Sequence, residues 1–116
     1  MKVYRGYNCH HNNYGSPPGQ PIWVTASPFY ASIYAQRHNG RVVEFDLNKS
    51  ELKLYHKHQY SPVSKEFIEE VRNAGCNAWQ ISYGPDCFGI DQKGWAIIDK
   101  DILRNPEIVE YWDTLK

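Results

Sequence analysis

The chain has 116 residues, and its 13 Lys and Arg residues balance its 13 Asp and Glu residues, so the formal net charge at neutral pH is zero. This length suits one domain with a single hydrophobic core and excludes two such cores. A neutral chain has no global field that attracts nucleic acid or an anionic membrane, and no stretch approaches the roughly 20 apolar residues that span a bilayer. Aromatic residues make up 15% of the chain, so many should be buried or line a site.

The number and spacing of the cysteines favour a reducing environment. Cys9, Cys76 and Cys87 are an odd number, and none belongs to a C-x-x-C pair. An odd number cannot complete a disulfide framework. The residues after Met1 lack the apolar run of a signal peptide. We therefore expect a cytoplasmic protein in a reducing environment.

The first half of the chain predicts strands around one helix. Residues 3–5 should form a strand that ends at Gly6, residues 7–21 a long loop rich in Asn, Gly, Pro and His, and residues 22–25 a second strand. Ser27 and Pro28 begin a helix, with Ser27 as its N-cap, and residues 39–40 end it. The i, i+4 spacing predicts that one apolar stripe of this helix is buried, namely Phe29, Tyr30, Ile33 and Tyr34.

Two strands should follow this helix, and further elements complete the chain. Residues 41–47 form a strand with Val43 and Phe45 on one face, and residues 51–56 a strand with Leu52 and Leu54 inward. A helix begins at Ser61–Pro62 or at Ser64. Its expected buried stripe is Phe67, Ile68, Val71 and Ala74, and Gly75 ends it.

The last third should alternate strands and loops before a final helix. We expect a strand at 76–82, a long loop at 83–94 and a buried strand at 95–98. Asn105–Pro106 should begin a helix with its apolar face at Ile108, Tyr111, Trp112 and Leu115. Single helices between pairs of strands predict the α+β class.

Arg5 and two hydroxyl residues are the first candidates for chemistry. Arg5 lies at a strand end that faces the long loop, where a guanidinium can bind a phosphate or carboxylate with two donors. Thr25 and Ser27 alternate at the end of the second strand, so their hydroxyls are expected on the same side. The simpler alternative is that Arg5 pairs with a surface acid, Thr25 only favours a strand and Ser27 only caps the helix.

These motifs resemble a known family. Tyr-Arg-Gly at residues 4–6, an aromatic-Val-Thr-x-Ser segment at 23–27 and a helix with Ala and Tyr at 30–35 are similar to the Arg-Ser-Glu branch of the ADP-ribosyltransferases. The strand at 40–47 and the late segments 74–79 and 95–99 are similar to that family too. The likeness covers most of the chain through short motifs. It implies one ADP-ribosyltransferase-like domain over residues 1–116, with a split core of two small sheets, a cleft between them and flanking helices.

The resemblance also implies an activity. The expected function is that of an NAD-dependent mono-ADP-ribosyltransferase that modifies a macromolecular target, expected to be a protein, with NAD as the substrate. Compact phage-encoded members exist, and some of them are anti-CRISPR proteins. The size of this chain suits that group, which would act in the cytoplasm of the host.

The site residues implied by the resemblance fall into two groups. Arg5 would contact the phosphates or ribose of NAD, and Tyr30 or Tyr34 would stack on the cationic nicotinamide ring. The NAD-binding group is Tyr4, Arg5, Gly6, Tyr30 and Tyr34, and the catalytic group is Thr25, Ser27 and Asp91. A carboxylate would stabilise an oxocarbenium-like state at the ribose C1 atom.

The position of that carboxylate departs from the family pattern. The family glutamate precedes or opens a late strand, but residues 89–94 contain no Glu. Asp91 is the nearest substitute, and Gln92 comes next.

Several alternatives stay open. A non-catalytic protein-binding inhibitor on the same fold would use the aromatic excess as interface anchors. Residues 55–60 interleave basic and aromatic side chains, as single-strand nucleic-acid binders do, although the neutral chain argues against this. The adjacent Cys9, His10 and His11 do not have a usual zinc spacing, so no metal is expected. Cys87 as a nucleophile has no supporting local pattern.

Overall fold

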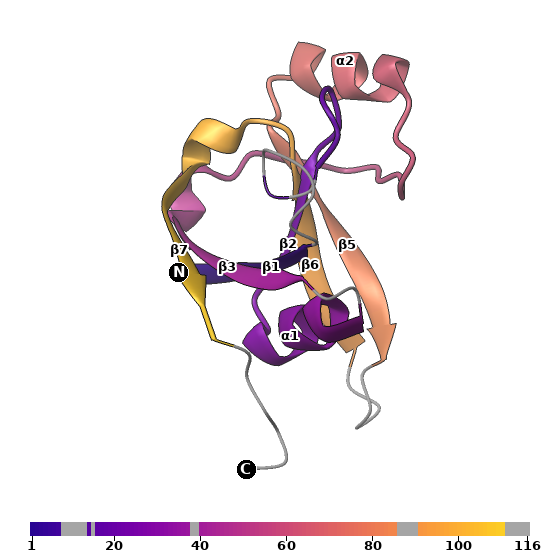
Figure 1. Ribbon diagram of the computed structural model, residues 1–116. Coiled ribbons are helices and arrows are strands. Elements are labelled where there is room, and N and C mark those ends of the chain that lie inside the picture. Colours follow the sequence, from indigo (N-terminus) through magenta and orange to yellow (C-terminus); the bar gives the residue numbers. More distant parts are fainter. Residues whose placement is uncertain (8–13, 15, 38–39, 86–90, 111–116) are drawn as a thin grey trace.

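The computed structural model (Figure 1) describes residues 1–7, 14, 16–37, 40–85 and 91–110, and for 83–85 and 91–92 it describes the backbone alone. Within these residues the chain is a mixed α/β fold with seven strands and two α-helices. The strands are β1 (Lys2–Tyr7), β2 (Ile22–Thr25), β3 (Arg41–Leu47), β4 (Leu54–Tyr55), β5 (Ala78–Pro85), β6 (Asp91–Ile97) and β7 (Leu103–Val109). The helices are α1 (Pro28–Arg37) and α2 (Lys65–Asn73), with two 3₁₀ turns, η1 (Lys49–Glu51) and η2 (Lys100–Ile102).

The strands form one sheet in the order β4-β5-β6-β2-β1-β3-β7. Its weakest junction lies between β1 and β2, which pair at a single position, Tyr4 opposite Thr25, whereas β1 and β3 pair at six positions. We call this junction the seam. It divides the sheet into two halves, β1-β3-β7 and β2-β6-β5-β4, and β1 and β3 run in a clearly different direction from β5 and β6 (Figure 1). We expected two small sheets, and the hydrogen bonding instead joins the two halves at the seam.

The main core lies between these two halves. One hydrophobic cluster combines Val3 and Phe45 from the first half with Val24 and Ile97 from the second. Because side chains alternate along a strand, the intervening residues face outward, toward the helices. The inner faces of the two halves therefore pack against each other in one core, and the outer face of each half packs against a helix.

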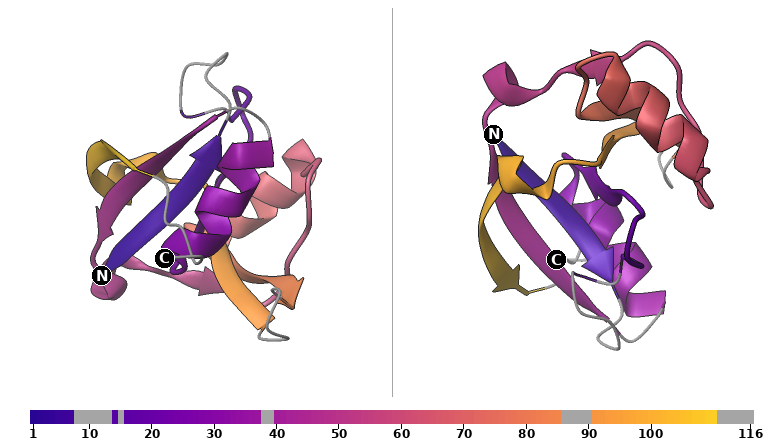
Figure 2. Two further views of the ribbon diagram at one scale, coloured as in Figure 1. Left: turned by 60° about the horizontal axis from the view of Figure 1, so that its bottom comes forward. Right: turned by 90° about the horizontal axis from the view of Figure 1, so that it is seen from above.

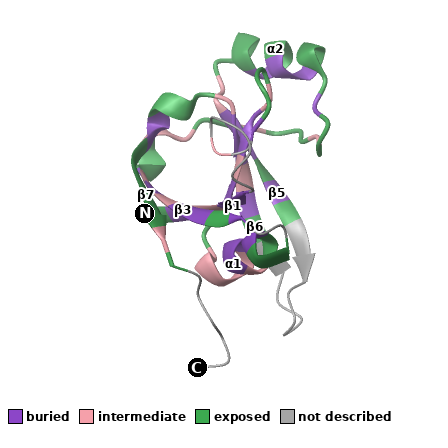
Figure 3. Ribbon diagram, in the orientation of Figure 1, coloured by how far each residue is buried: buried purple, intermediate pink, exposed green. Residues whose placement is uncertain are grey.

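The helix α2 covers the outer face of β5 and β6. Phe67, Ile68 and Val71 pack with Trp79 and Ile81. These three helix residues are the expected ones, whereas Ala74 is exposed. Figure 3 shows exposed residues over most of the rest of this helix. The helix begins at the second of the two expected starts, because the Ser64 hydroxyl accepts the backbone N–H of Phe67 at 3.2 Å.

The helix α2 ends where the sequence predicted, with Gly75 just beyond it in the left-handed conformation at φ 76°. The segment 61–62, the other expected start, lies in the connection before the helix.

The helix α1 covers β1 and β3 with a different face from the one expected. Its buried residues are Ala31, Ser32 and Ala35, whereas Phe29, Tyr30, Ile33 and Tyr34 are only partly buried or exposed. The reason lies in the strand beneath it. A Cβ atom on Gly6 would lie 2.2 Å from the carbonyl oxygen of Ala31, so the helix backbone touches the strand and only short side chains fit between them. Figure 2 shows α1 lying against β1.

The start of α1 agrees with the prediction. Pro28 is its first residue, and the Ser27 hydroxyl accepts the N–H of Tyr30 at 3.1 Å. The helix ends at Arg37, and Asn39 of the expected cap lies outside the described residues.

The helix expected from Asn105–Pro106 onward is wrong, and the error concerns the strand formed by residues 103–109. They form β7, which pairs with β3 at the edge of the sheet. Pro106 is tolerated there because a proline on an edge strand need not donate a ladder hydrogen bond. Leu103 is buried in the main core, so long-range packing outweighs the local helical spacing. The remaining residues of the expected helical face, Tyr111, Trp112 and Leu115, lie outside the described residues.

Two other expectations need correction. Residues 83–94 are not one loop, because β5 continues to Pro85 and β6 begins at Asp91. Residues 51–56 are not one strand, because η1 ends at Glu51 and only Leu54–Tyr55 pair, and the side chain of Leu54 is 44% exposed. The extent of β5 is set by its pairing with β6, and the extent of β4 is set by its pairing with β5.

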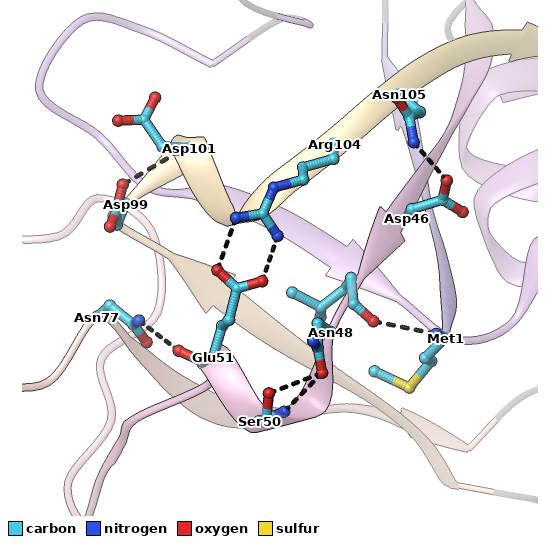
Figure 4. A network of polar contacts seen from close by, with 11 residues as sticks. Met1, Asp46, Asn48, Ser50, Glu51, Asn77, Asp99, Asp101, Arg104 and Asn105 are labelled. Carbon is cyan, nitrogen blue, oxygen red and sulfur yellow. Dashed lines mark hydrogen bonds and ion pairs between the residues drawn. The ribbon is translucent and has the colours of Figure 1, made fainter.

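A polar network stabilises the connection after β3 (Figure 4). The Arg104 guanidinium of β7 binds the Glu51 carboxylate with two nitrogens. The Asn77 side chain donates to the backbone oxygen of Glu51 at 2.7 Å and accepts the N–H of Lys53 at 2.9 Å. The network thus joins β7 and the start of β5 through η1. Within the described residues, neither helix has the length and apolar character needed to cross a membrane.

Candidate functional site

A cleft of about 450 Å³ lies at the seam, between α1 and the segment 60–62. Its floor residues Tyr4, Gly6, Trp23, Thr25 and Ile81 come from β1, β2 and β5. Trp23 and Ile81 belong to the cluster under α2, and Tyr4 packs with the cluster under α1. The cleft is therefore the space that the two helices leave uncovered where the halves of the sheet diverge. Its volume falls in the range of small-molecule sites.

Most of the residues selected from the sequence lie at this cleft. Those that line it are Tyr4, Arg5, Gly6, Thr25, Tyr30 and Tyr34. They come from three separate elements, β1, β2 and α1, which the fold brings together. Ser27 follows β2 but does not line the cleft. Asp91 is the first residue of β6, opposite Pro85, and its side chain is outside the described part of the chain.

The Arg5 side chain is held at the seam by backbone carbonyl groups. Its Nε atom donates to the oxygen of Tyr14 at 2.6 Å, and its Nη1 atom donates to the oxygen of Trp23 at 3.1 Å. These bonds fix the plane and direction of the guanidinium before any ligand arrives. They also connect β1 to the loop that precedes β2 and to β2 itself.

The two hydroxyl residues make structural hydrogen bonds. The Thr25 hydroxyl donates to the oxygen of Lys93 at 3.2 Å and accepts the N–H of Ser27 at 3.1 Å, and Thr25 is 3% exposed. The Ser27 hydroxyl caps α1 through Tyr30. Both residues therefore fix the turn from β2 into α1, and Thr25 also links that turn to β6.

Three tyrosines give the cleft its aromatic walls. Burial raises the pKa of Tyr4, and the carboxylate of Glu44, its cross-strand partner, raises it further. Burial also raises the pKa of Tyr30, against the opposing effect of Arg37. Both phenols are therefore neutral at physiological pH and can donate hydrogen bonds. Tyr34, which also lines the cleft, is 47% exposed.

Sequence reasoning missed the wall opposite α1. Gln20, Tyr60 and Ser61 line the cleft there. The sequence placed Gln20 in a loop and Ser61 at one of two expected helix starts, and it considered Tyr60 only as part of the segment 55–60 for nucleic-acid binding. The Tyr60 hydroxyl donates to the oxygen of Ser82 at 3.0 Å, which holds this wall against β5. The turn-forming run Pro17-Pro18-Gly19 was the signal available for Gln20, since it fixes the direction of the chain there.

The other sequence candidates lie elsewhere or outside the described residues. In the segment 55–60, Tyr55 packs against Phe67 and donates to Glu70 at 2.7 Å, whereas His56 and His58 are exposed. The candidate ligands and nucleophile at residues 9–11 and 87 lie outside the described residues. Among the residues that are described, no group of three or more His, Cys, Asp and Glu is placed to hold a metal ion.

The arrangement offers two kinds of recognition. A fixed guanidinium can bind phosphate groups, and the aromatic walls can hold a planar ring, which is attracted more strongly when it is cationic. The described lining contains no carboxylate. A scan against protein-family models and searches of curated proteins and of solved structures found no match for this chain.

Proposed function

We propose that the cleft binds NAD and that the protein is a mono-ADP-ribosyltransferase of ADP-ribosyltransferase-like architecture acting on a macromolecular target. One observation carries the proposal. Six residues selected through the family motifs, from three separate elements, line a single cleft at the junction between two halves of a sheet. The divergence of the two halves of the sheet at the seam, where β1 and β2 pair at one position, supports the proposed architecture.

The lining residues suit the parts of NAD. Arg5 would bind the pyrophosphate, and Tyr30 or Tyr34 would stack on the nicotinamide. In the reaction the bond between C1 of the ribose and the nicotinamide nitrogen breaks, and nicotinamide leaves with the electron pair. A nucleophile of the target then bonds to C1 and loses its proton.

Asp91 is our candidate for the carboxylate that stabilises the positive charge at C1. It precedes Gly94, the β6 partner of Thr25, by three residues, so its backbone lies near the cleft end of β2. This register and the family pattern of a carboxylate at the start of a late strand support its selection.

A second function is favoured by a specific observation. The exposed rings of Tyr34 and Tyr60, at 47% and 51%, stand on opposite walls of a cleft whose described lining holds no carboxylate. Such a rim suits a non-catalytic interface with a protein partner, because exposed tyrosines are frequent anchors of protein interfaces.

Nicotinamide release from NAD tests the proposal. The purified protein is assayed alone and with a lysate of its natural host, and NAD binding is measured by calorimetry. We expect release that depends on the lysate and is lost in Asp91→Asn, but kept in the control Asp101→Asn on exposed η2. Absence of both release and binding would overturn the NAD proposal and leave the interface function.

A further inference from the structure

A tight turn delivers the side chain of Gln20 to the cleft. The N–H of Gln20 donates to the oxygen of Pro17 at 3.1 Å, and Gly19 between them has φ 78°. Proline at the second position and a left-handed glycine at the third are the features of a type II turn. The sequence Pro17-Pro18-Gly19-Gln20 therefore fixes the backbone from which the Gln20 side chain projects.

The Gln20 amide binds both backbone polar groups of Val63. Its Nε2 atom donates to the oxygen of Val63 at 2.9 Å, and its Oε1 atom accepts the N–H of Val63 at 3.0 Å. We call this pair of bonds the Gln20–Val63 bridge. Val63 is 4% exposed and packs in the cluster under α2. The bridge thus anchors the end of the cleft wall 60–62 to the adjacent turn at residues 17–20.

The other end of this wall is also held. The indole N–H of buried Trp79 donates to the oxygen of Gln59 at 3.0 Å, and Tyr60 donates to Ser82. Both of these bonds run to or from β5, on one side of the wall. The bridge runs instead from the wall to the loop before β2, so it holds the wall against that loop.

We propose that Gln20 is a positioning residue, which holds the wall 60–62 in place and thereby sets the affinity of the cleft for its ligand. The identity of that ligand, NAD, rests on the proposed function. Gln20 acts by holding Val63 in place and takes no part in the reaction itself. Without the bridge the wall samples other positions, and the apparent affinity falls by the fraction of time for which the wall is correctly placed.

The experiment compares two variants that lose the same kind of interaction. Gln20→Ala removes the bridge. Asn77→Ala removes an equivalent pair, because the Asn77 amide also binds one backbone oxygen and one backbone N–H, but far from the cleft lining. Two properties are measured for each, the dissociation constant of NAD by calorimetry and the amide hydrogen exchange of residues 60, 61 and 63. Gln20→Glu, which keeps the acceptor and loses the donor, serves as the conservative variant.

We expect Gln20→Ala to weaken NAD binding about tenfold, as a wall placed correctly about one-tenth of the time would do. Exchange at Val63 should accelerate only in the Gln20 variants, and Gln20→Glu should be intermediate. Equal losses of affinity in Gln20→Ala and Asn77→Ala, or unchanged exchange at Val63, would overturn the positioning role. If the unaltered protein does not bind NAD, the proposed function fails, and the exchange comparison alone decides the role of Gln20.

Discussion

The Nη1 atom of Arg5 donates a hydrogen bond to the backbone oxygen of Trp23 across the seam, where β1 and β2 pair at one position only. A side chain thus connects two strands whose backbones have already begun to separate. The same separation opens the cleft. Arg5 is therefore both a connection between the halves of the sheet and a donor group placed at the site.

Replacing Arg5 by Lys should weaken NAD binding and destabilise the fold together. An ammonium cannot make the forked bonds of a guanidinium, and each lost charge-assisted bond is worth about 1.5–3 kcal/mol. We expect NAD affinity to fall by about 10- to 100-fold. Calorimetry and urea unfolding measure the two effects. Arg41→Lys, at an exposed position that begins β3, is the control, and unchanged NAD binding in Arg5→Lys would contradict the assigned role.

Adding one methyl group at Gly6 should be far more damaging than adding it at Gly75. The new Cβ at Gly6 would lie 2.2 Å from the Ala31 oxygen and 3.0 Å from the Ala35 nitrogen, which are backbone atoms that cannot move aside. We expect Gly6→Ala to cost about 3 kcal/mol or more of unfolding free energy, because α1 must shift.

At Gly75 the added Cβ meets no atom within 4 Å, but φ is 76°. Gly75→Ala should therefore cost about 1–2 kcal/mol through backbone strain alone. Chemical denaturation of both variants makes the comparison, and similar costs would show that α1 does not contact β1 as described.

Replacement of Ser27 separates helix capping from chemistry. Ser27→Ala should lower the free energy of unfolding by about 1 kcal/mol, because the N–H of Tyr30 loses its acceptor. Ser27→Asp keeps an acceptor at the helix N-terminus and should keep both stability and NAD binding. A stable Ser27→Asp protein that no longer releases nicotinamide would instead give the hydroxyl a direct part in the reaction.

The pair formed by Glu51 and Arg104 predicts an acid-dependent loss of stability. The Arg104 guanidinium lowers the pKa of Glu51 below its ordinary value of 4.5 in the folded protein. The pKa of Glu51 is therefore lower in the folded protein than in the unfolded chain, so the ionised carboxylate stabilises the folded protein at pH values above the unfolded pKa. This stabilisation is lost as the pH falls through the folded pKa.

The unaltered protein should therefore be more stable than Glu51→Gln at about pH 6, and the difference should shrink toward about pH 3. Unfolding by urea across this range provides the measurement. Salt should reduce the difference because the pair is at the surface. A difference that is constant with pH would show that the pair does not form in solution.

Local chemistry explains the features that the sequence predicted well. The hydroxyls of Ser27 and Ser64 cap their helices through bonds to residues three positions later, and residues 22–25 form β2 as expected. The stripe of α2 at Phe67, Ile68 and Val71 also follows from spacing alone. Each of these features depends on a few neighbouring residues, so it can be predicted from the sequence alone.

Contacts between distant residues explain the errors. The spacing of apolar residues favoured Phe29 and Ile33 as the buried face of α1, but Gly6 in β1 brings the helix so close that only Ala31 and Ala35 fit. Residues 103–109 are a strand because β3 offers them a partner. The wall of the cleft at 60–62 was missed for the same reason, since Gln20 and Val63 are 43 residues apart.

The sequence by itself predicted a fold that mixes helices and strands, the start of α1, two alternative starts for α2 of which one is correct, and a set of candidate residues, six of which line one cleft. Short-range capping, turn chemistry and side-chain alternation act within a few residues and need no knowledge of the fold. Only the tertiary structure decided that the sheet is joined at one pair of residues, which face of α1 is buried and which wall faces it across the cleft. Those features depend on how closely distant backbones approach, and the close approach of α1 to Gly6 is a property of the assembled fold.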